Sequence, residues 1–182
     1  MINKKNIIVV TGGAGFVGSN LISLLIKKTT FRIISIDNYS TGKKTNHIKN
    51  RRINYLRSDT KNISKTLKSY STKIHSLFHF GEFSRIYQSF LNMEICIDSN
   101  TIGTNAVFNF CLLNKIKLIY SATSASLGNK GKDKNLSPYA FTKAKNLEML
   151  ENLKKWFQFK FEIIYFTMYM GLDKSKQVKW LL

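Results

Sequence analysis

The sequence predicts an α/β fold, a Rossmann-type doubly wound parallel sheet with helices on both faces. Short apolar segments of strand length alternate along the chain with longer segments of helical periodicity. A glycine-rich turn with the pattern G-x-x-G-x-x-G, from Gly12 to Gly18, joins the first apolar segment to the first helical one. An acidic residue, Asp37, closes the second apolar segment. Together these observations predict a domain that binds a dinucleotide at its first strand–helix turn.

Each element is predicted from its own residue pattern. We expect strands at 6–11, 31–38, 53–59, 74–80, 116–122 and 160–166. We expect helices at 16–28, 62–70, 94–114 and 136–157. The first helix places Val17, Leu21, Leu24 and Leu25 on one apolar face. The last helix is predicted to begin with Ser137 as N-cap and Pro138 in its first turn.

Length and composition indicate one folded domain and limit the classes of function. The chain has 182 residues, of which 43% are hydrophobic, enough for a core. No apolar run approaches the ~18 residues of a membrane span, and the short apolar start does not resemble a secretory signal. We therefore expect a cytoplasmic protein without a membrane partner.

The net charge of +19 is the feature that could indicate a nucleic-acid partner. However, Lys far outnumbers Arg, and the basic residues form no long block. Asn and Ile are also abundant. Biased genome composition accounts for such a balance, so no nucleic-acid partner is expected. A generally positive field would still attract anionic ligands such as nucleotides.

The cysteines and histidines show no metal-site spacing. Cys96 and Cys111 form no C-x-x-C pair and lie in helix-like sequence, which predicts buried free thiols. His47 and His75 have no partner at a ligand spacing, so no metal site is expected. His79 ends a predicted strand, and we interpret it as a packed core histidine.

The glycine turn has the residues that a bound pyrophosphate requires. Gly12 allows a tight turn, Gly15 lets the backbone approach the phosphates, and Gly18 lets helix and strand pack closely. The free N–H groups of the helix that follows would then face the phosphates. Asp37 would accept hydrogen bonds from the adenosine ribose and repel a 2′-phosphate, which favours NAD over NADP. The alternative is a structural turn with a helix-capping Asp.

Several motifs in order resemble the extended short-chain dehydrogenase/reductase family, which includes NAD-dependent nucleotide-sugar epimerases and dehydratases. The resemblance covers roughly residues 6–166 and is closest to UDP-glucose 4-epimerase-like proteins. The motifs are "TGGAGFVGSNL" (11–21), "IDNYSTG" (36–42), "SD" (58–59), "HFGE" (79–82), "NTIGTNAV" (100–107), "YSATSASLG" (120–128) and "SPYAFTKAKNLEML" (137–150). Gly81 and Glu82 depart mildly from the small residues of the family, and Glu82 has no explanation from the sequence.

The resemblance implies a set of binding residues. For NAD, these are Gly12, Gly15, Phe16, Val17, Gly18, Asp37, Asn38, Ser40, Asp59, Phe80, Gly81, Asn100, Tyr139 and Lys143. For a nucleotide sugar of the UDP-hexose type, they are Ser84, Arg85 and Thr123. The family's substrate loops lie where this chain has residues 83–90, although the pattern there is loose. Family dimers pair through the long helices near 94–114 and 137–157, which implies a homodimer here.

The catalytic residues implied are Thr123, Tyr139 and Lys143. Tyr139 and Lys143 are four residues apart in predicted helix and therefore lie on the same face. A free phenol has a pKa near 10, and we expect the Lys143 ammonium to lower the pKa of Tyr139 toward neutrality. A hydroxyl at the end of the fifth strand shares the substrate's hydrogen bond. The alignment assigns this to Thr123, or to Ser124 if the register slips by one.

The implied reaction is the epimerisation of a nucleotide sugar by transient oxidation. Tyr139 takes a proton from a sugar hydroxyl, NAD accepts the hydride, and the keto-sugar turns over and takes the hydride back. A dehydratase is an alternative, but related dehydratases carry an Asp-Glu pair beside the catalytic Thr, and "SATSAS" has no acid. A non-catalytic NAD-binding module is a second alternative.

The resemblance stops near Phe166. Family members continue with a motif close to Asn-Val-Tyr-Gly-Pro and a further domain that binds the nucleotide of the sugar donor. This chain reads "YFTMYMGLDKSKQVKWLL". We expect an NAD-binding Rossmann domain with the catalytic residues at 1–166 and an atypical tail at 167–182. A one-base shift would restore the motif, so the tail is interpreted as out-of-frame, the C-terminal substrate domain as missing, and turnover by this chain alone as small or absent.

Overall fold

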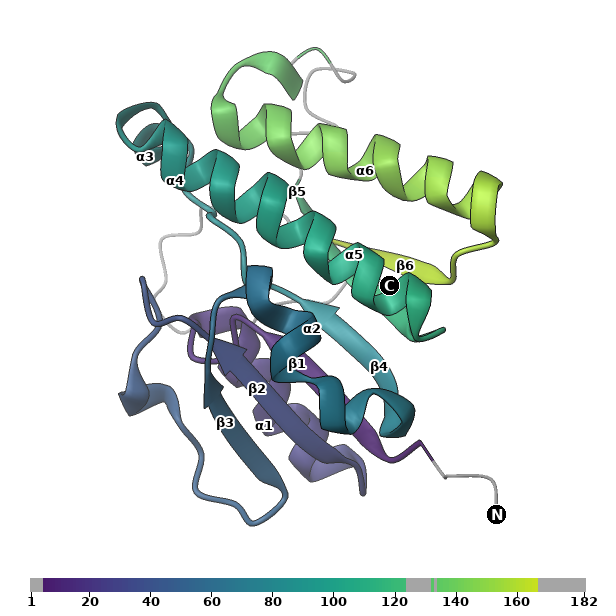
Figure 1. The fold of residues 1–182 in the computed structure, drawn as a ribbon. Coiled ribbons are helices and arrows are strands. Elements are labelled where there is room, and N and C mark those ends of the chain that lie inside the picture. Colours follow the sequence, from purple (N-terminus) through teal and green to yellow (C-terminus); the bar gives the residue numbers. More distant parts are fainter. Residues whose placement is uncertain (1–4, 124–131, 133, 167–182) are drawn as a thin grey trace.

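The computed structural model describes residues 5–123, 132 and 134–166. This part of the chain forms a parallel sheet of six strands in the order β3-β2-β1-β4-β5-β6 (Figure 1). The strands are β1 Ile7–Thr11, β2 Arg32–Asp37, β3 Ile53–Arg57, β4 Ile74–His79, β5 Lys117–Thr123 and β6 Phe161–Phe166. The strand order reverses between β1 and β4, and a doubly wound sheet binds its ligand at the carboxyl ends of the strands at such a point.

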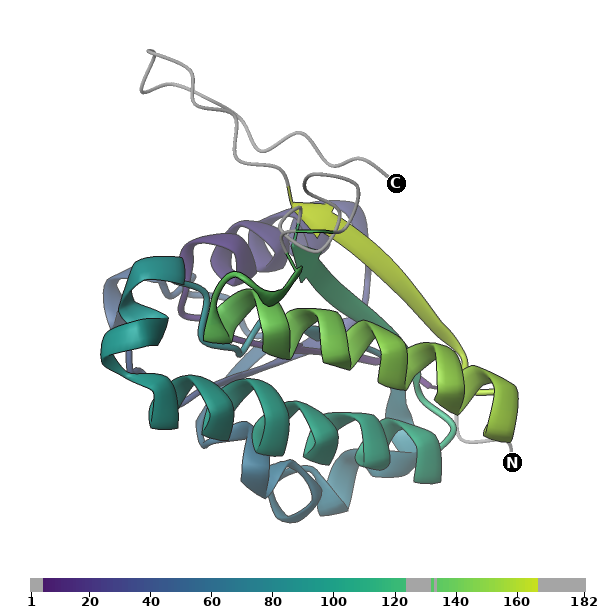
Figure 2. The ribbon, with the colours of Figure 1, turned by 90° about the horizontal axis from the view of Figure 1, so that it is seen from above.

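Helices cover both faces of the sheet, as the sequence predicts. Helix α1 (Phe16–Lys28) lies on one face, and α2 (Ile63–Thr66), α5 (Thr104–Leu113) and α6 (Pro138–Phe157) lie on the other (Figures 1 and 2). Because successive strand residues point to opposite faces, β1 is buried on both sides. Ile8 and Val10 pack in the core beneath α1, whereas Ile7 and Val9 pack in the larger core beneath α5 and α6.

Two predicted helices are interrupted. The segment predicted as one helix at 94–114 forms α4 (Met93–Ile97), a π-helical segment η4 (Asp98–Gly103) and α5. At Gly103, η4 passes so close to η2 (Thr60–Asn62) that a Cβ would lie 2.4 Å from Thr60 Oγ1. The helix predicted at 62–70 is likewise divided into η2, α2 and η3 (Lys68–Lys73). A further 3-10 turn, η1, spans Lys44–Asn46. Tertiary contact therefore overrides local helical periodicity at these places.

The segment 83–90, which the sequence places among substrate loops, is helical over most of its length. Helix α3 spans Ile86–Leu91 and precedes α4 directly. Its apolar residues are mostly exposed, with Ser89 as its buried residue. Ser89 Oγ accepts a hydrogen bond of 3.3 Å from the backbone N–H of Tyr139, which ties α3 to the start of α6.

The capping and cysteine predictions are confirmed. Ser137 is the N-cap of α6, its hydroxyl accepts the N–H of Ala140 at 3.0 Å, and Pro138 is in the first turn. Cys96 and Cys111 are buried free thiols, and burial raises the pKa of both. Within the described ranges, no helix is both long and apolar enough to span a membrane. The tail 167–182 lies outside the described residues.

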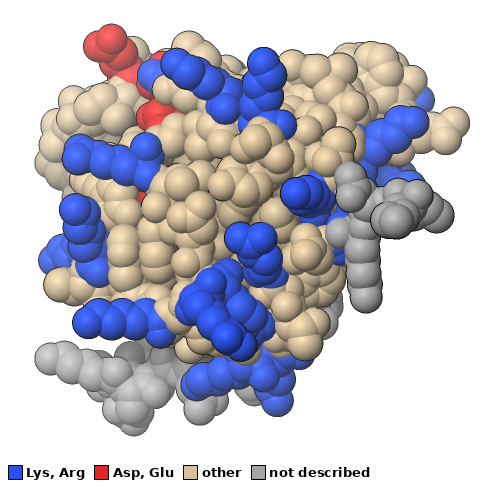
Figure 3. All heavy atoms as spheres, turned by 60° about the horizontal axis from the view of Figure 1, so that its bottom comes forward, with Lys and Arg blue, Asp and Glu red and all other residues tan. Residues whose placement is uncertain are grey.

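The positive charge is distributed over the surface. In a space-filling view with the bottom of Figure 1 brought forward, Lys and Arg side chains are spread across the face and Asp and Glu gather at one edge (Figure 3). Among the ion pairs of the described residues, Lys143–Glu82 is the one in which both side chains are buried.

Candidate active site

The glycine turn between β1 and α1 is fixed by its own backbone packing. Gly12 has a φ of +70°, and a Cβ there would lie 2.6 Å from the carbonyl oxygen of Phe80. A Cβ on Gly18 would lie 2.3 Å from the carbonyl oxygen of Gly12. Gly15 differs, because the one neighbour its Cβ would meet within 4 Å is the Gly12 oxygen at 3.2 Å. The turn therefore leaves space beside Gly15, which suits the close approach of a pyrophosphate.

The N-terminus of α1 begins at this open space. Gly15 is the N-cap and provides no side-chain hydrogen bond, and the first turn contains no acidic residue. The first N–H groups of a helix lack intrahelical partners and carry the positive end of its dipole. Phe16 is exposed and Val17 is half-buried. The glycine turn and the start of α1 are thus arranged so that backbone N–H groups can hold an anion.

Asp37 ends β2 next to the turn. Its carboxylate accepts the N–H of Ala14 at 2.9 Å and that of Tyr39 at 2.8 Å, and the residue is 9% exposed. Asp37 therefore has a structural role in the turn, but it does not cap α1, which the sequence offered as an alternative, because Ala14 precedes the N-cap Gly15. This role does not exclude a ribose contact, because each carboxylate oxygen has a second lone pair.

Asn38, Ser40 and Asp59 lie together at the carboxyl ends of β2 and β3. Asn38 Nδ2 donates to Asp59 Oδ2 at 3.0 Å, and Asn38 Oδ1 accepts the N–H of Ser40 at 2.9 Å. Asp59 Oδ1 also accepts the N–H of Lys61 at 2.9 Å, so it caps η2. The residues expected at the adenosine end of NAD thus form one connected group beside Asp37.

The turn after β4, which begins at His79, lies against the glycine turn. Thr11 Oγ1 accepts N–H groups of Phe80 (3.2 Å) and Gly81 (3.1 Å), so its own proton is directed to His79 Nδ1 at 2.7 Å. His79 Nε2 then donates to Thr104 Oγ1 at 3.0 Å. Burial lowers the pKa of His79 to about 4, so the ring is neutral at pH 7. The prediction of a packed core histidine is confirmed.

Asn100 supports this turn from the helix side. Its Oδ1 accepts the N–H of Phe83 at 2.7 Å, and its Nδ2 donates to the carbonyl oxygen of Phe83 at 3.0 Å. Nδ2 also donates to Thr142 Oγ1 at 3.2 Å, and the residue is fully buried. Asn100 was expected to contact NAD, but here its side chain is used within the protein and positions the backbone after Phe80.

Thr123 and Tyr139 meet at the carboxyl end of β5. A side-chain hydrogen bond with Thr123 lowers the pKa of the Tyr139 phenol, but burial has the larger effect, and the net pKa is raised. The charge on Glu82 raises it further. The expected lowering of this pKa by Lys143 is therefore wrong for this structure. Ser124, the alternative to Thr123, lies outside the described residues.

Lys143 is turned toward a residue that the sequence did not assign. Its Nζ donates to Glu82 Oε2 and to the carbonyl oxygen of Ser121, near the carboxyl end of β5. The two side chains are 4% and 3% exposed. The signal in the sequence was the acid at position 82 in place of a small residue, but its partner lies 61 residues away and only the fold brings them together.

Ser84 and Arg85 are exposed at the entrance to α3, where Arg85 is the N-cap. The structure brings them to the turn that follows Glu82 without placing them against Tyr139. Their role toward a substrate stays a prediction.

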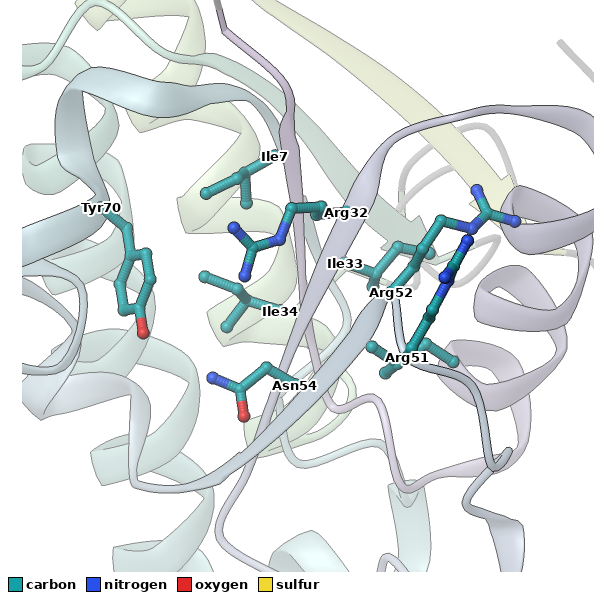
Figure 4. Close-up of a pocket in the computed structure, with 9 residues that line it drawn as sticks. Ile7, Arg32, Ile33, Ile34, Arg51, Arg52, Asn54 and Tyr70 are labelled. Carbon is teal, nitrogen blue, oxygen red and sulfur yellow. The ribbon is translucent and has the colours of Figure 1, made fainter.

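A small hollow lies at the other end of the sheet, among the amino ends of β1, β2 and β3 (Figure 4). Its volume of about 30 Å³ is too small for a nucleotide. One of its arginines, Arg52, has a structural role, because its guanidinium donates to the carbonyl oxygens of Thr29 (2.6 Å) and Ile26. Over the residues that the structure describes, no group of three His, Cys, Asp or Glu could hold a metal ion.

Solved structures with this fold are numerous. The chain is similar to UDP-glucose 4-epimerase from Brucella ovis in complex with NAD, with a TM-score of 0.79 and 22% identity over 92% of this chain and 54% of that chain. It is similar to the UDP-Glc/GlcNAc 4-epimerase of Campylobacter jejuni, with a TM-score of 0.78 and 23% identity over 88% and 53%. It is also similar to UDP-N-acetylglucosamine 4-epimerase from Methanobrevibacter ruminantium M1, with a TM-score of 0.75 and 25% identity over 88% of this chain and 54% of that chain.

The chain spans about half the length of these proteins. A family model also matches residues 8–177, which include the glycine turn, Glu82 and the Thr123–Tyr139–Lys143 set. The chain therefore belongs to the NAD dependent epimerase/dehydratase family.

Proposed function

We propose that this protein binds NAD and contributes the catalytic residues for the epimerisation of a nucleotide sugar. The observation that carries the proposal is the hydrogen-bonded Thr123–Tyr139 pair, with Lys143 one helical turn from Tyr139. This pair and the glycine turn both lie at the carboxyl ends of the parallel strands. A protein that only binds NAD has no need of all three side chains. The solved structures to which it is similar include several UDP-sugar 4-epimerases, which supports a UDP-hexose as substrate.

In the proposed reaction, bound NAD would accept the hydride from the sugar carbon that bears the reacting hydroxyl and return it to the other face of the keto-sugar. The Tyr139 oxygen accepts the proton of a sugar hydroxyl, and Thr123 shares that hydrogen bond and orients the hydroxyl. The keto-sugar turns over in the site, and the proton returns from Tyr139 as the alcohol is re-formed. Because burial raises the pKa of Tyr139, this residue is held as a phenol in the structure and must lose its proton before it can act as the base.

Binding and turnover test the proposal in two steps. Isothermal titration with NAD comes first, and interconversion of UDP-glucose and UDP-galactose follows. Tyr139→Phe keeps the ring and removes the base, so turnover should fall by 10²-fold or more, on the order expected for loss of a general base. Because Tyr139 is also expected to contact NAD, some loss of NAD affinity is expected, but it should be far smaller than the loss of turnover. Epimerisation that survives Tyr139→Phe unchanged would contradict the catalytic assignment, and absence of NAD binding would contradict the proposal as a whole.

A non-catalytic NAD-binding module is the second candidate, and the Glu82–Lys143 contact favours it. In this structure Lys143 does not lower the pKa of Tyr139, as a working base would require. NAD binding without turnover of any UDP-hexose would support this candidate. Dehydration is disfavoured because "SATSAS" carries no acid beside Thr123.

A further inference from the structure

A buried ion pair joins the turn after β4 to helix α6. Lys143 Nζ contacts Glu82 Oε2, and the two side chains are almost completely removed from solvent. The other ion pairs of the described residues differ, since Lys61–Asp98, Lys117–Glu162 and Lys145–Glu148 each have both side chains at least 38% exposed. Removing two charges from water is costly unless the pair is also well hydrogen-bonded.

Glu82 has the hydrogen bonds that such a pair requires. Its Oε1 accepts the hydroxyl of Thr104 at 2.9 Å, the hydroxyl of Tyr120 at 2.9 Å and the Asn146 side-chain amide at 3.2 Å. These donors come from α5, β5 and α6. They fix the carboxylate from one side, so that the other oxygen, Oε2, is directed to Lys143.

Lys143 is held equally firmly. Its Nζ donates to the Ser121 carbonyl oxygen, lies 3.5 Å from Ser121 Oγ, and is 4.4 Å from the centre of the Tyr120 ring. The ammonium therefore has acceptors and an aromatic face around it. Burial lowers the pKa of the amine, and the charge and hydrogen bond of Glu82 oppose that effect.

The other titratable side chains around the pair carry no charge at neutral pH. His79 from β4 is neutral, and burial raises the pKa values of Cys96 from α4, Tyr120 from β5 and Tyr139 from α6. Within the described part of the chain, Glu82 is therefore the counter-charge of Lys143. Burial alone would raise the pKa of Glu82, but the charge of Lys143 and the hydrogen bonds from Lys143 and Thr104 hold it below its usual value.

We propose that Glu82 is a positioning residue that keeps the Lys143 amine protonated and fixed at the end of β5 before the cofactor binds. Without Glu82, burial would lower the pKa of the amine unopposed and so favour its neutral form. The inference deepens the proposed function, and it rests on that function only where Lys143 is expected to contact NAD. The charge state of the pair is a property of the protein without NAD and is tested separately.

The test is the pH dependence of stability of the protein without NAD. Glu82→Gln keeps an oxygen for Thr104 and Tyr120 but removes the charge. The folded-state pKa of Lys143 then falls far below its unfolded value, so the unfolded state binds more protons. Stability should rise with pH between the two values, with about one proton taken up on unfolding. In the wild type this dependence is confined to more alkaline pH.

Lys143→Met should give a pH dependence of stability with the opposite sign. Glu82 is then buried without its counter-charge, its folded-state pKa rises above the unfolded value, and stability falls as the pH rises. The double variant, Glu82→Gln with Lys143→Met, has no charge in the site and should show neither slope. Glu148→Gln is the matched control, because it removes the acid of the exposed Lys145–Glu148 pair on the same helix. Melting temperatures followed by circular dichroism from pH 4.5 to 9.5 provide the readout, because the Glu82 slope begins at its unfolded pKa of 4.5 and the Lys143 slope lies below 10.5.

A Glu82→Gln variant that is destabilised equally at every pH would overturn the proposal, because Glu82 would then serve only as a hydrogen-bond acceptor. If Glu82→Gln fails to fold at pH 7, the double variant decides. Folding restored by loss of Lys143 supports the proposal, and failure of both variants overturns it.

A second measurement connects the pair to the cofactor. If wild-type protein binds NAD, the affinity of Glu82→Gln should decrease as the pH rises through the lowered pKa of Lys143, while that of Glu148→Gln should follow the wild type. If the wild type does not bind NAD, the proposed function fails, and the pH dependence of stability still decides the role of Glu82.

Discussion

His79 has both ring nitrogens hydrogen-bonded inside the protein, to Thr11 and to Thr104. Thr104 in turn donates to Glu82, so one continuous chain of hydrogen bonds runs from the end of β1 to the buried ion pair. Thr11 Oγ1 accepts hydrogen bonds from two backbone N–H groups, and this determines which group donates at each later step of the chain. The neutral histidine therefore links the glycine turn to the buried Lys143–Glu82 pair.

The first prediction concerns this histidine. Its folded-state pKa of about 4 lies below the unfolded value of 6.5, so its contribution to stability is present above pH 6.5 and is lost as the pH falls toward 4. The shift corresponds to about 3 kcal/mol at the acid end. His79→Gln should flatten the decline in melting temperature between pH 6.5 and 4. His75→Gln, on an exposed histidine, should leave the decline unchanged.

The second prediction compares two glycines of one turn. Gly18→Ala forces a Cβ against the Gly12 backbone and should destabilise the protein by about 1–3 kcal/mol, as overpacking does. A Cβ at Gly15 meets only the Gly12 carbonyl oxygen, at 3.2 Å, whereas a Cβ at Gly18 meets that oxygen at 2.3 Å and two further backbone atoms within 3 Å. Gly15→Ala should therefore cost less stability than Gly18→Ala but weaken NAD binding. Urea denaturation and NAD titration separate the two effects. Equal loss of stability in both variants would contradict this account of the turn.

Helix α6 shows how much of an element can be predicted from local sequence. Ser137 and Pro138 mark its start, and a left-handed Gln158 with a φ of 55° follows its end. All six strands are also close to their predicted bounds, because a buried parallel strand is a short apolar run. The break at η4 could not be predicted in this way, because the close approach of Gly103 to Thr60 is a contact between distant parts of the chain.

The third prediction tests the start of α6. Ser137→Ala removes the hydroxyl that accepts the Ala140 N–H and should cost about 1 kcal/mol of stability. Ser137→Asp retains an acceptor and should restore most of the loss. Thermal melts of the three proteins are the measurement, and an alanine variant as stable as the wild type would show that the cap contributes nothing.

At the scale of the whole molecule, the strand order places the reversal between β1 and β4, so the glycine turn and the turn after β4 face each other. The surface of the molecule carries a set of exposed apolar side chains along α4, η4 and α5, which include Ile95, Ile102 and Leu113. Exposed apolar surface of this kind marks interaction sites.

The fourth prediction is that this surface supports a homodimer, as the resemblance implies. Sedimentation velocity over a range of concentrations should show a dimer, and Ile95→Glu should shift the equilibrium toward monomer. Leu24→Glu changes an exposed apolar residue on α1, on the opposite face of the sheet, and should not do so. A wild type that stays monomeric at all concentrations would contradict the prediction.

The sequence by itself determined the parallel α/β sheet, the glycine turn, the cap of α6 and the set of residues expected to act together. These depend on local periodicity, on backbone conformations that glycine adopts, and on spacing within one helix. The tertiary structure decided the direction of Lys143, the raised pKa of Tyr139 and the inward use of Asn100. Each depends on burial and on partners distant in sequence, because the charge of a buried amine is set by the residue that the fold places beside it.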